Sequence, residues 1–235
     1  MIHFIIGYNN PKFKENIVNN LKRLKAESFI IVQNGAIWEK QNNEIILNSK
    51  LGVCNFLNTG LNYLKSNYPN DWFARLDADD YYGESYNDEI YYAMNNNFDF
   101  SGITNMFVKT ENEQLYLCKE NAPFGGTLSG SISKACFFNS EKEYGEDSIW
   151  FKEMSKNQKF YDRSPKSYSL VRYNNHKHTF PMSANSIAQT SLKAYLIGPW
   201  DEDVVNFKKE FELKDLNINP SCLFDDIRRM QELFV

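Results

Sequence analysis

The sequence predicts an α/β fold with a mostly parallel central sheet flanked by helices, followed by a helical C-terminal tail. Three observations support this fold class. Short apolar runs alternate with helix-like segments in the first half of the chain, and such alternation implies right-handed strand–helix–strand crossovers. The run WFARL at residues 72–76 has the largely apolar character of a strand covered on both faces. With 42% hydrophobic and 15% aromatic residues, the 235-residue chain can form a sizeable core.

Strands and helices alternate along the first half of the predicted chain, except that two strands follow one another at 29–32 and 44–47. Hydrophobic periodicity places strands at residues 2–6, 29–32, 44–47 and 72–76, and helices at 16–25 and 53–64. Ligands bind open α/β sheets beyond the carboxyl ends of their strands. The polar residues that follow residue 76 are therefore expected at a binding edge.

The second half of the chain predicts a mixture of elements. The expected segments are a helix around 89–95, strands at 98–108, 114–118 and 168–173, a glycine-rich connection at 122–131, a helix entered through a loop at 145–156, and amphipathic tail helices at 199–211 and 222–234. A weak boundary near residues 181–185 divides the chain into a catalytic domain at 1–184 and a helical C-terminal extension at 185–235 that packs on it.

Composition narrows the classes of protein and partner. The formal charge of -4 and pI near 5.5 disfavour, without excluding, a protein held to nucleic acid or anionic membrane by phosphate contacts. The four cysteines are far apart and match neither a zinc site nor a disulfide framework. The N-terminus has no signal-peptide pattern, and no stretch approaches the ~20 apolar residues of a membrane span. We expect a soluble cytoplasmic protein, and its oligomeric state is left open.

Three carboxylates, Asp77, Asp79 and Asp80, follow the strand at 72–76. Two anions ~4 Å apart repel by roughly 4 kcal/mol at the effective dielectric near a protein surface, so the cluster suggests a bound cation. On an extended segment Asp77 and Asp79 share a face. Mg²⁺ and Mn²⁺ take such oxygen ligands, and substrate phosphates often complete the shell of Mg²⁺. The alternative is an acidic turn that caps a following helix.

Four segments together resemble, in order and spacing, the family-two inverting glycosyltransferases of GT-A fold. They are IIGYNN at 5–10, IIVQNG at 30–35, GVCNFLNTGLNYLK at 52–65 and WFARLDADD at 72–80. The family's G-x-x-x-x-x-N-x-G pattern is met by Gly52, Asn58 and Gly60, and its L-D-x-D-D pattern by the three aspartates. The resemblance covers the first eighty residues well and the next hundred loosely.

The resemblance implies a nucleotide-sugar donor, UDP-linked in the first instance, and an Mn²⁺ or Mg²⁺ cofactor. It places Tyr8, Asn9, Asn34 and Asn58 at the donor nucleotide, Asp77 near the ribose or the metal, and Asp79 on the metal as a direct ligand. Where the family commonly has acidic residues, the second strand here ends Gln33-Asn34-Gly35. Contacts to the nucleoside there would be amide hydrogen bonds, so the nucleobase of the donor is left open. For Tyr8 and Asn9 a turn-forming role is the alternative.

A second acidic pair, Glu146-Asp147, precedes the helical pattern of residues 149–154. An inverting enzyme needs a carboxylate general base for the acceptor hydroxyl, and a helix N-terminus favours the ionised form by about 0.3 to 1 kcal/mol. In the family an acidic pair heading a helix fills this role, so Asp147 is the candidate base. Its alternative is a simple helix cap.

Two histidines, His176 and His178, lie two residues apart and share a face if their segment is a strand. Neutral imidazole is an acceptable Mn²⁺ ligand, and metal-dependent GT-A enzymes often place a late histidine on the metal. Spacing does not decide between the two residues. Exposed or hydrogen-bonding histidines are the alternative.

The predicted function is therefore metal-dependent inverting transfer of a sugar from a nucleotide-sugar to an acceptor hydroxyl. The acceptor is expected to be a glycan, a lipid-linked molecule or another hydroxyl compound, with surface polysaccharide synthesis as the first expectation. Three alternatives remain: glycosylation of a protein or of a hydroxylated nucleic-acid base, a nucleotidyltransferase of the same fold, and a non-catalytic nucleotide- or glycan-binding module. A nucleotidyltransferase would usually carry a basic, glycine-rich phosphate loop, and GYNNPKFKEN at 7–16 is a poor one.

Overall fold

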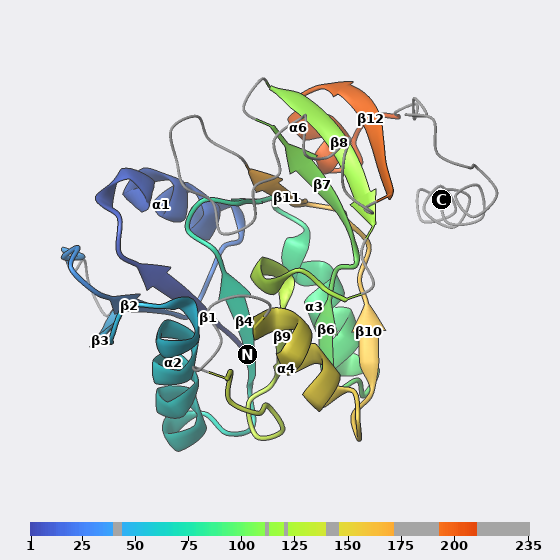
Figure 1. The fold of residues 1–235 in the computed structure, drawn as a ribbon. Coiled ribbons are helices and arrows are strands. Elements are labelled where there is room, and N and C mark those ends of the chain that lie inside the picture. Colours follow the sequence, from blue (N-terminus) through green and yellow to red (C-terminus); the bar gives the residue numbers. More distant parts are fainter. Residues whose placement is uncertain (40–43, 111–112, 120–121, 140–145, 172–192, 211–235) are drawn as a thin grey trace.

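The protein folds as two sheets with helices on both faces of the larger one (Figure 1). The computed structural model describes residues 1–39, 44–110, 113–119, 122–139, 146–171 and 193–210. The larger sheet has the order β10-β6-β9-β4-β1-β2-β3. Its strands are β1 (Ile2–Tyr8), β2 (Phe29–Gln33), β3 (Ile45–Asn48), β4 (Trp72–Leu76), β6 (Phe100–Gly102), β9 (Ser129–Ser131) and β10 (Phe160–Asp162).

The pairings β1–β2, β1–β4, β2–β3 and β6–β10 are parallel, and only β9 pairs antiparallel with its two neighbours. The prediction of a mostly parallel central sheet is thus confirmed. The glycine-rich connection was expected as a loop, but its last residues form β9 between β4 and β6. Gly130 fits there because a β-carbon at that position would lie 3.0 Å from the Cβ of Phe100.

Two hydrophobic clusters cover the two faces of this sheet, because successive residues of β1 point to opposite sides. Phe4 and Ile6 pack on the side of α1 (Lys14–Arg23) and α3 (Tyr86–Asn95). Ile5 packs on the side of α2 (Val53–Asn67) and α4 (Glu146–Met154). These four helices were all predicted, within a few residues of their observed bounds.

The smaller sheet has the order β12-β8-β7-β11-β5 and lies beyond the end of β4 (Figure 1). Its strands are β5 (Tyr81–Tyr82), β7 (Asn105–Lys109), β8 (Gln114–Lys119), β11 (Tyr168–Val171) and β12 (Lys193–Pro199). The single strand-like run predicted at 98–108 is in fact divided between β6 in one sheet and β7 in the other. A short helix, α6 (Glu202–Val205), buries Val204 and Val205 against the smaller sheet.

The C-terminal prediction is only partly matched. The predicted boundary between residues 184 and 185 lies outside the described residues, as does the expected helix at 222–234. Of the helix expected at 199–211, only the four residues of α6 are helical in the described chain, because residues 206–209 form turns and bends; the strand β12 just before α6 was not predicted. Because β12 pairs antiparallel with β8, residues 193–199 belong to the smaller sheet, whose other strands all lie before the predicted boundary.

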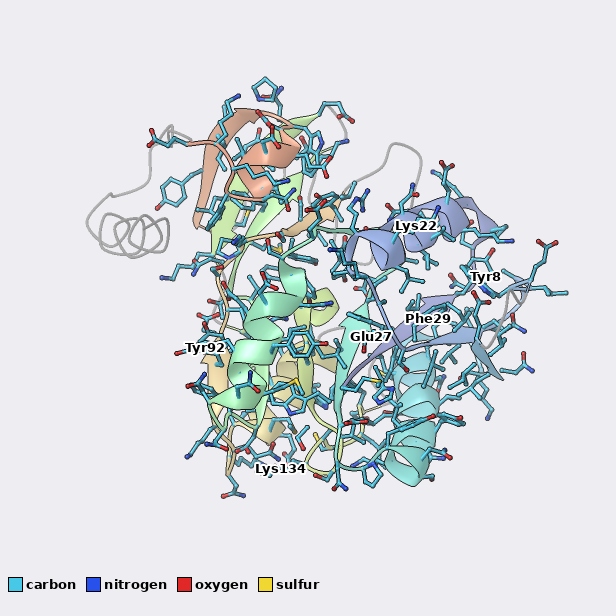
Figure 2. The ribbon with its side chains drawn as sticks, turned by 180° about the vertical axis from the view of Figure 1, so that it is seen from behind. Tyr8, Lys22, Glu27, Phe29, Tyr92 and Lys134 are labelled. Carbon is cyan, nitrogen blue, oxygen red and sulfur yellow. The ribbon has the colours of Figure 1, made fainter. Side chains whose placement is uncertain are left out.

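Two basic residues, Lys22 and Arg23, lie in the last turn of α1. Lys22 is exposed, on the outer side of the helix (Figure 2). Arg23 instead lies over the ring of Tyr81, with the guanidinium carbon 4.7 Å from the ring centroid, and donates to Asn20 Oδ1 at 2.6 Å. This helix face is therefore not a patch of unpaired positive charge.

Candidate functional site

The chain turns sharply after β4, and residues 77–80 form what we call the acidic turn. The amide of Asp80 lies 3.4 Å from the carbonyl oxygen of Asp77, and residues 78 and 79 have turn geometry. The expectation of an extended segment with Asp77 and Asp79 on one face is wrong, because residues 78 and 79 turn the backbone and side chains do not alternate there as in a strand.

Arg75, two residues before the turn, supplies a positive charge that the sequence analysis overlooked. Its guanidinium binds Asp77 through two parallel contacts, Nε to Oδ1 at 2.6 Å and Nη2 to Oδ2 at 2.9 Å. The same guanidinium reaches Glu146 Oε1 from Nη1 at 3.3 Å. A charged residue in an otherwise apolar central strand needs a partner, and this signal could have identified Arg75 from the sequence.

Asp80 points into the protein and is 1% exposed. Its Oδ2 accepts a hydrogen bond from the Tyr168 hydroxyl at 2.7 Å, and its Oδ1 accepts one from the Val171 amide at 3.1 Å. Its carbonyl oxygen accepts from the side-chain amides of Asn16 and Asn20 on α1, at 2.9 and 2.8 Å. Asp80 therefore anchors the acidic turn between α1 and β11, while Asp79 is half-buried.

The short helix η2 (Gly125–Thr127) forms a wall of the site. The Tyr82 hydroxyl accepts from the Asp77 amide at 2.9 Å and donates to the Gly126 carbonyl at 2.8 Å. The Gly125 amide donates to Asp147 Oδ2 at 3.1 Å. The glycine-rich connection, interpreted from the sequence as a plain loop, thus links the acidic turn to α4.

The two acidic residues at the start of α4 differ in environment. Glu146 is 8% exposed and faces Arg75, whereas Asp147 is half-buried. Besides the Gly125 amide, Asp147 accepts from the Ser148 amide at 2.7 Å. Gly125 belongs to η2 and Ser148 to the first turn of α4, so backbone amides from two segments hold the Asp147 side chain.

Burial and charge set the protonation of the groups around the acidic turn. Burial opposes the charged form of Arg75, but Asp77 and Glu146 outweigh it and raise the pKa of the guanidinium. Burial, with added repulsion from Asp77 and Asp80, raises the pKa of Tyr82 and Tyr168 well above the usual value. Both hydroxyls therefore remain protonated donors, and Arg75 remains charged.

Tyr8 and Asn34 meet at the carboxyl ends of β1 and β2, where the nucleoside was expected. The Asn34 amide donates to the Tyr8 carbonyl at 3.1 Å, and Asn34 Nδ2 donates to the Ser49 carbonyl at 2.7 Å. The Tyr8 ring is buried and packs edge-on against Trp38, with ring centroids 5.1 Å apart. Asn9 follows Tyr8 and is exposed.

Asn58, also expected at the nucleotide, binds a backbone segment. Its Nδ2 donates to the Phe138 carbonyl at 2.8 Å, and its Oδ1 accepts from the Phe138 amide at 2.7 Å. Gly60, two residues on, allows α2 to approach Ile5, since a β-carbon there would lie 2.6 Å from Ile5 Cγ2. Gly52, before α2, has a φ of 118° that favours glycine. All three members of the pattern thus have structural tasks, and nucleotide binding by Asn58 stays a prediction.

The remaining candidate metal ligands, His176 and His178, lie outside the described residues. The amide of Val171, the last described residue before them, donates a hydrogen bond to Asp80 Oδ1. Within the parts of the chain that the structure describes, no three His, Cys, Asp or Glu side chains form a group that could hold a metal ion. Nor is any described helix both long and apolar enough to cross a membrane.

No protein-family model matches the chain, and no curated protein matches it. Among solved structures, it resembles residues 1–349 of S. aureus TarS in complex with UDP-GlcNAc, with a TM-score of 0.57 and 15% identity over 80% of this chain and 63% of that one. A second TarS 1–349 structure matches with a TM-score of 0.54 and 15% identity, over 72% and 60%. A longer TarS structure matches with a TM-score of 0.53 and 16% identity, over 72% and 36%.

These likenesses concern the fold. The chain spans about three fifths of the shorter TarS structures and about a third of the longer one. At this level of identity, they show that the chain shares the TarS architecture of a mostly parallel sheet flanked by helices, and the predicted GT-A-type fold class is confirmed.

Proposed function

We propose that the protein is a glycosyltransferase that moves a sugar from a UDP-linked donor to an acceptor hydroxyl with inversion at the anomeric carbon. The observation that carries the proposal is the meeting of two acidic segments, distant in sequence, at one end of the sheet. Arg75 contacts both the acidic turn and the first turn of α4. The likeness to a TarS structure that contains UDP-GlcNAc supports a nucleotide-sugar as the donor class.

Asp147 is the proposed general base. The neighbouring Glu146 is buried and paired with Arg75, so it is poorly placed to accept a proton from an incoming hydroxyl. Asp147 is half-buried, and the backbone amides of Gly125 and Ser148 hold its carboxylate in place, which suits a group that must meet an incoming hydroxyl. In a single displacement it would take the hydroxyl proton as the oxygen attacks the anomeric carbon from the face opposite the leaving nucleotide.

The proposed cofactor is a divalent cation that the acidic turn would share with the substrate. Mg²⁺ is usually held by one or two carboxylates with substrate phosphates, and Asp79 and Asp77 could supply these; His176 or His178 could add an Mn²⁺ ligand. Both histidines lie outside the described residues, so their part in the site rests on the resemblance alone. When bound, Mn²⁺ or Mg²⁺ would neutralise charge on the leaving diphosphate.

The nucleoside would lie over the ends of β1 and β2, near Tyr8, Asn9 and Asn34, with Asn58 on α2 as the fourth proposed contact. Asn34 and its neighbour Gln33 offer amides in place of carboxylates. An amide has both donors and an acceptor, so it can pair with the imide edge of uracil. This supports a UDP-linked donor without fixing the sugar.

The acceptor is proposed to be a glycan hydroxyl, with surface polysaccharide as the first class to test. A protein, a lipid-linked molecule or a hydroxylated nucleic-acid base would use the same chemistry. A nucleotidyltransferase and a non-catalytic binding module are the competing functions, and they differ in what happens to the donor.

The test is a screen of UDP-sugars with Mn²⁺ and glycan acceptors, which follows UDP release. We expect turnover by the wild-type protein and a loss of about 100-fold or more in kcat for Asp147→Asn and Asp79→Asn. Asp88→Asn, at an exposed acidic position in the first turn of α3, is the matched control. Folded variants that all release UDP at the wild-type rate would refute the proposal, and metal-dependent UDP binding without turnover would favour the binding module.

A further inference from the structure

Arg75 makes ion-pair contacts on two sides of its guanidinium. Its side chain is 8% exposed and lies between Asp77, at 2.6 and 2.9 Å, and Glu146, at 3.3 Å. Asp77 opens the acidic turn, and Glu146 opens α4. One planar guanidinium thus touches the two segments to which the proposed chemistry is assigned.

The neighbouring backbone is shaped around this guanidinium. A β-carbon on Gly125 would lie 2.4 Å from Arg75 Nη1, closer than real contacts allow. The amide of the same glycine donates to Asp147 at 3.1 Å. Arg75, Gly125 and the first turn of α4 are therefore packed as one unit, and a shift of the guanidinium would shift Asp147.

We propose that Arg75 is a positioning residue that fixes Asp147 relative to the donor site by bridging Asp77 and Glu146. This inference rests on the proposed function. The bridge acts through geometry: the fork of an arginine holds a carboxylate in one orientation through two parallel bonds, while its third nitrogen constrains the helix. Neither Arg75 nor Glu146 needs to touch the substrate.

The energetics of buried ion pairs agree with a geometric role. Well-packed apolar residues often replace a buried ion pair at no cost in stability, so stability alone is a weak reason for three buried or half-buried charges here. Breaking the pair from one side is different, because it leaves a buried charge without compensation. The two single variants and the double variant therefore have distinct expected behaviour.

The test compares Glu146→Gln, Arg75→Met and the double variant. It measures kcat and KM for the donor, calorimetric UDP binding with Mn²⁺, and unfolding in urea without metal. Misplacement of a catalytic group by about 1 Å can cost about 100-fold, so we expect kcat to fall by about that factor in Glu146→Gln, with UDP affinity kept within about twofold. In Arg75→Met we expect kcat to fall similarly and UDP affinity to fall as well, because Asp77 is also released.

Both changes break the same bridge, so the kcat of the double variant should be no lower than that of Arg75→Met. For the same reason, the loss of unfolding free energy in the double variant should be smaller than the sum of the losses in the two single variants. Glu153→Gln, an exposed member of a surface pair on the same helix, is the matched control. Arg75→Lys keeps the charge but not the fork, so it should stay folded yet remain slow.

If the wild type is active, three results would overturn the inference while leaving the proposed function intact. The first is a wild-type kcat in folded Glu146→Gln, and the second is a fall in kcat in the double variant equal to the product of the falls in the two single variants. The third is a wild-type kcat in Arg75→Lys. A wild type that turns over no donor would remove the proposed function and this inference together.

Discussion

Charge compensation inside the acidic turn is the main feature at the residue scale. In the sequence, the three closely spaced carboxylates suggested that a bound cation offsets the repulsion between them. The structure shows internal compensation within this cluster: Arg75 pairs with Asp77, and Asp80 accepts hydrogen bonds from Tyr168 and Val171. Repulsion within the cluster is therefore a weaker reason for a bound cation than the sequence indicated, and the diphosphate of a donor is the stronger one.

The bond between Tyr168 and Asp80 gives a prediction at this scale. Tyr168→Phe removes the donor at 2.7 Å from a carboxylate that is 1% exposed, so we expect a loss of about 1–3 kcal/mol in unfolding free energy. Burial, then Asp80, raises the pKa of this tyrosine well above 10, so its contribution is present throughout the range below the unfolded pKa. Urea denaturation at pH 6 and pH 9 should give the same difference.

Tyr92→Phe is the control for this experiment. Tyr92 lies on the outer side of α3 and is 51% exposed (Figure 2). Its hydroxyl should contribute less than about 0.5 kcal/mol, as is usual for surface changes. Equal stability of Tyr168→Phe and Tyr92→Phe would show that Asp80 does not depend on the tyrosine.

At the scale of elements, Asp99 joins the ends of three strands just before β6. Its Oδ2 accepts from the Lys159 amide at 2.8 Å, next to β10, and its Oδ1 pairs with Lys134, which follows β9. Burial acts to raise the pKa of Asp99, but the bonds from Lys134 and the Lys159 amide outweigh it, and the pKa is lowered from 3.8. The ionised carboxylate is thus the form that holds these strand ends together.

The lowered pKa predicts how the stability contributed by Asp99 depends on pH. A carboxyl group with a depressed folded pKa stabilises the protein above its unfolded pKa, and this contribution disappears as pH falls through the folded value. Asp99→Asn should therefore cost about 1 kcal/mol at pH 7, and the difference from wild type should shrink below about pH 4. Urea unfolding between pH 3 and 7 measures it, with the exposed Asp88→Asn as control. A difference that is constant across this range would contradict the assignment.

At the scale of the whole molecule, the sequence was most informative where periodicity is regular. The apolar runs of residues 2–76 predicted β1 to β4 with α1 and α2 correctly, because the buried central strands β1, β2 and β4 read as apolar runs and the edge strand β3 is largely apolar as well. The sequence did not predict β5, β9, β10 or β12, and it merged β6 and β7 into one run. β9 and β10 have three residues each, β9 includes a glycine, and β12 is stabilised by β8, more than seventy residues earlier in the chain.

The candidate site was predictable to a similar degree. The acidic turn and the Glu146-Asp147 pair carry recognisable motifs, and the structure brings them together through Arg75. The partners of these groups were not predictable, since Tyr82, Tyr168 and Gly125 reach the site only through tertiary packing. A tyrosine in a strand gives no sign in the sequence that its hydroxyl will bind a carboxylate.

The C-terminal elements give the prediction that concerns the molecule as a whole. The chain was divided from its sequence at residues 184 and 185, yet β12 forms the edge of the smaller sheet beside β8. Beyond β12, Glu202 accepts from the Tyr81 hydroxyl at 2.6 Å, and Asn206 Nδ2 donates to the same hydroxyl at 2.8 Å. Tyr81 directly follows the acidic turn, so these contacts connect the C-terminal elements to the candidate site.

A chain that ends at residue 184 should therefore unfold at a lower temperature than the full chain and lose UDP binding, because it exposes the edge of β8 and the buried face of Tyr81. Asn206→Ala in the full chain tests the same contact without deleting a strand, and removal of a buried hydrogen-bonding group should cost about 1–3 kcal/mol. Glu210→Ala, at an exposed position nearby, is its control. Thermal unfolding with and without UDP and Mn²⁺ measures both effects. If the shortened chain melted at the full-length temperature and bound UDP equally well, residues 1–184 would be an independent domain, as the sequence first indicated, and β12 would be only an addition to its edge.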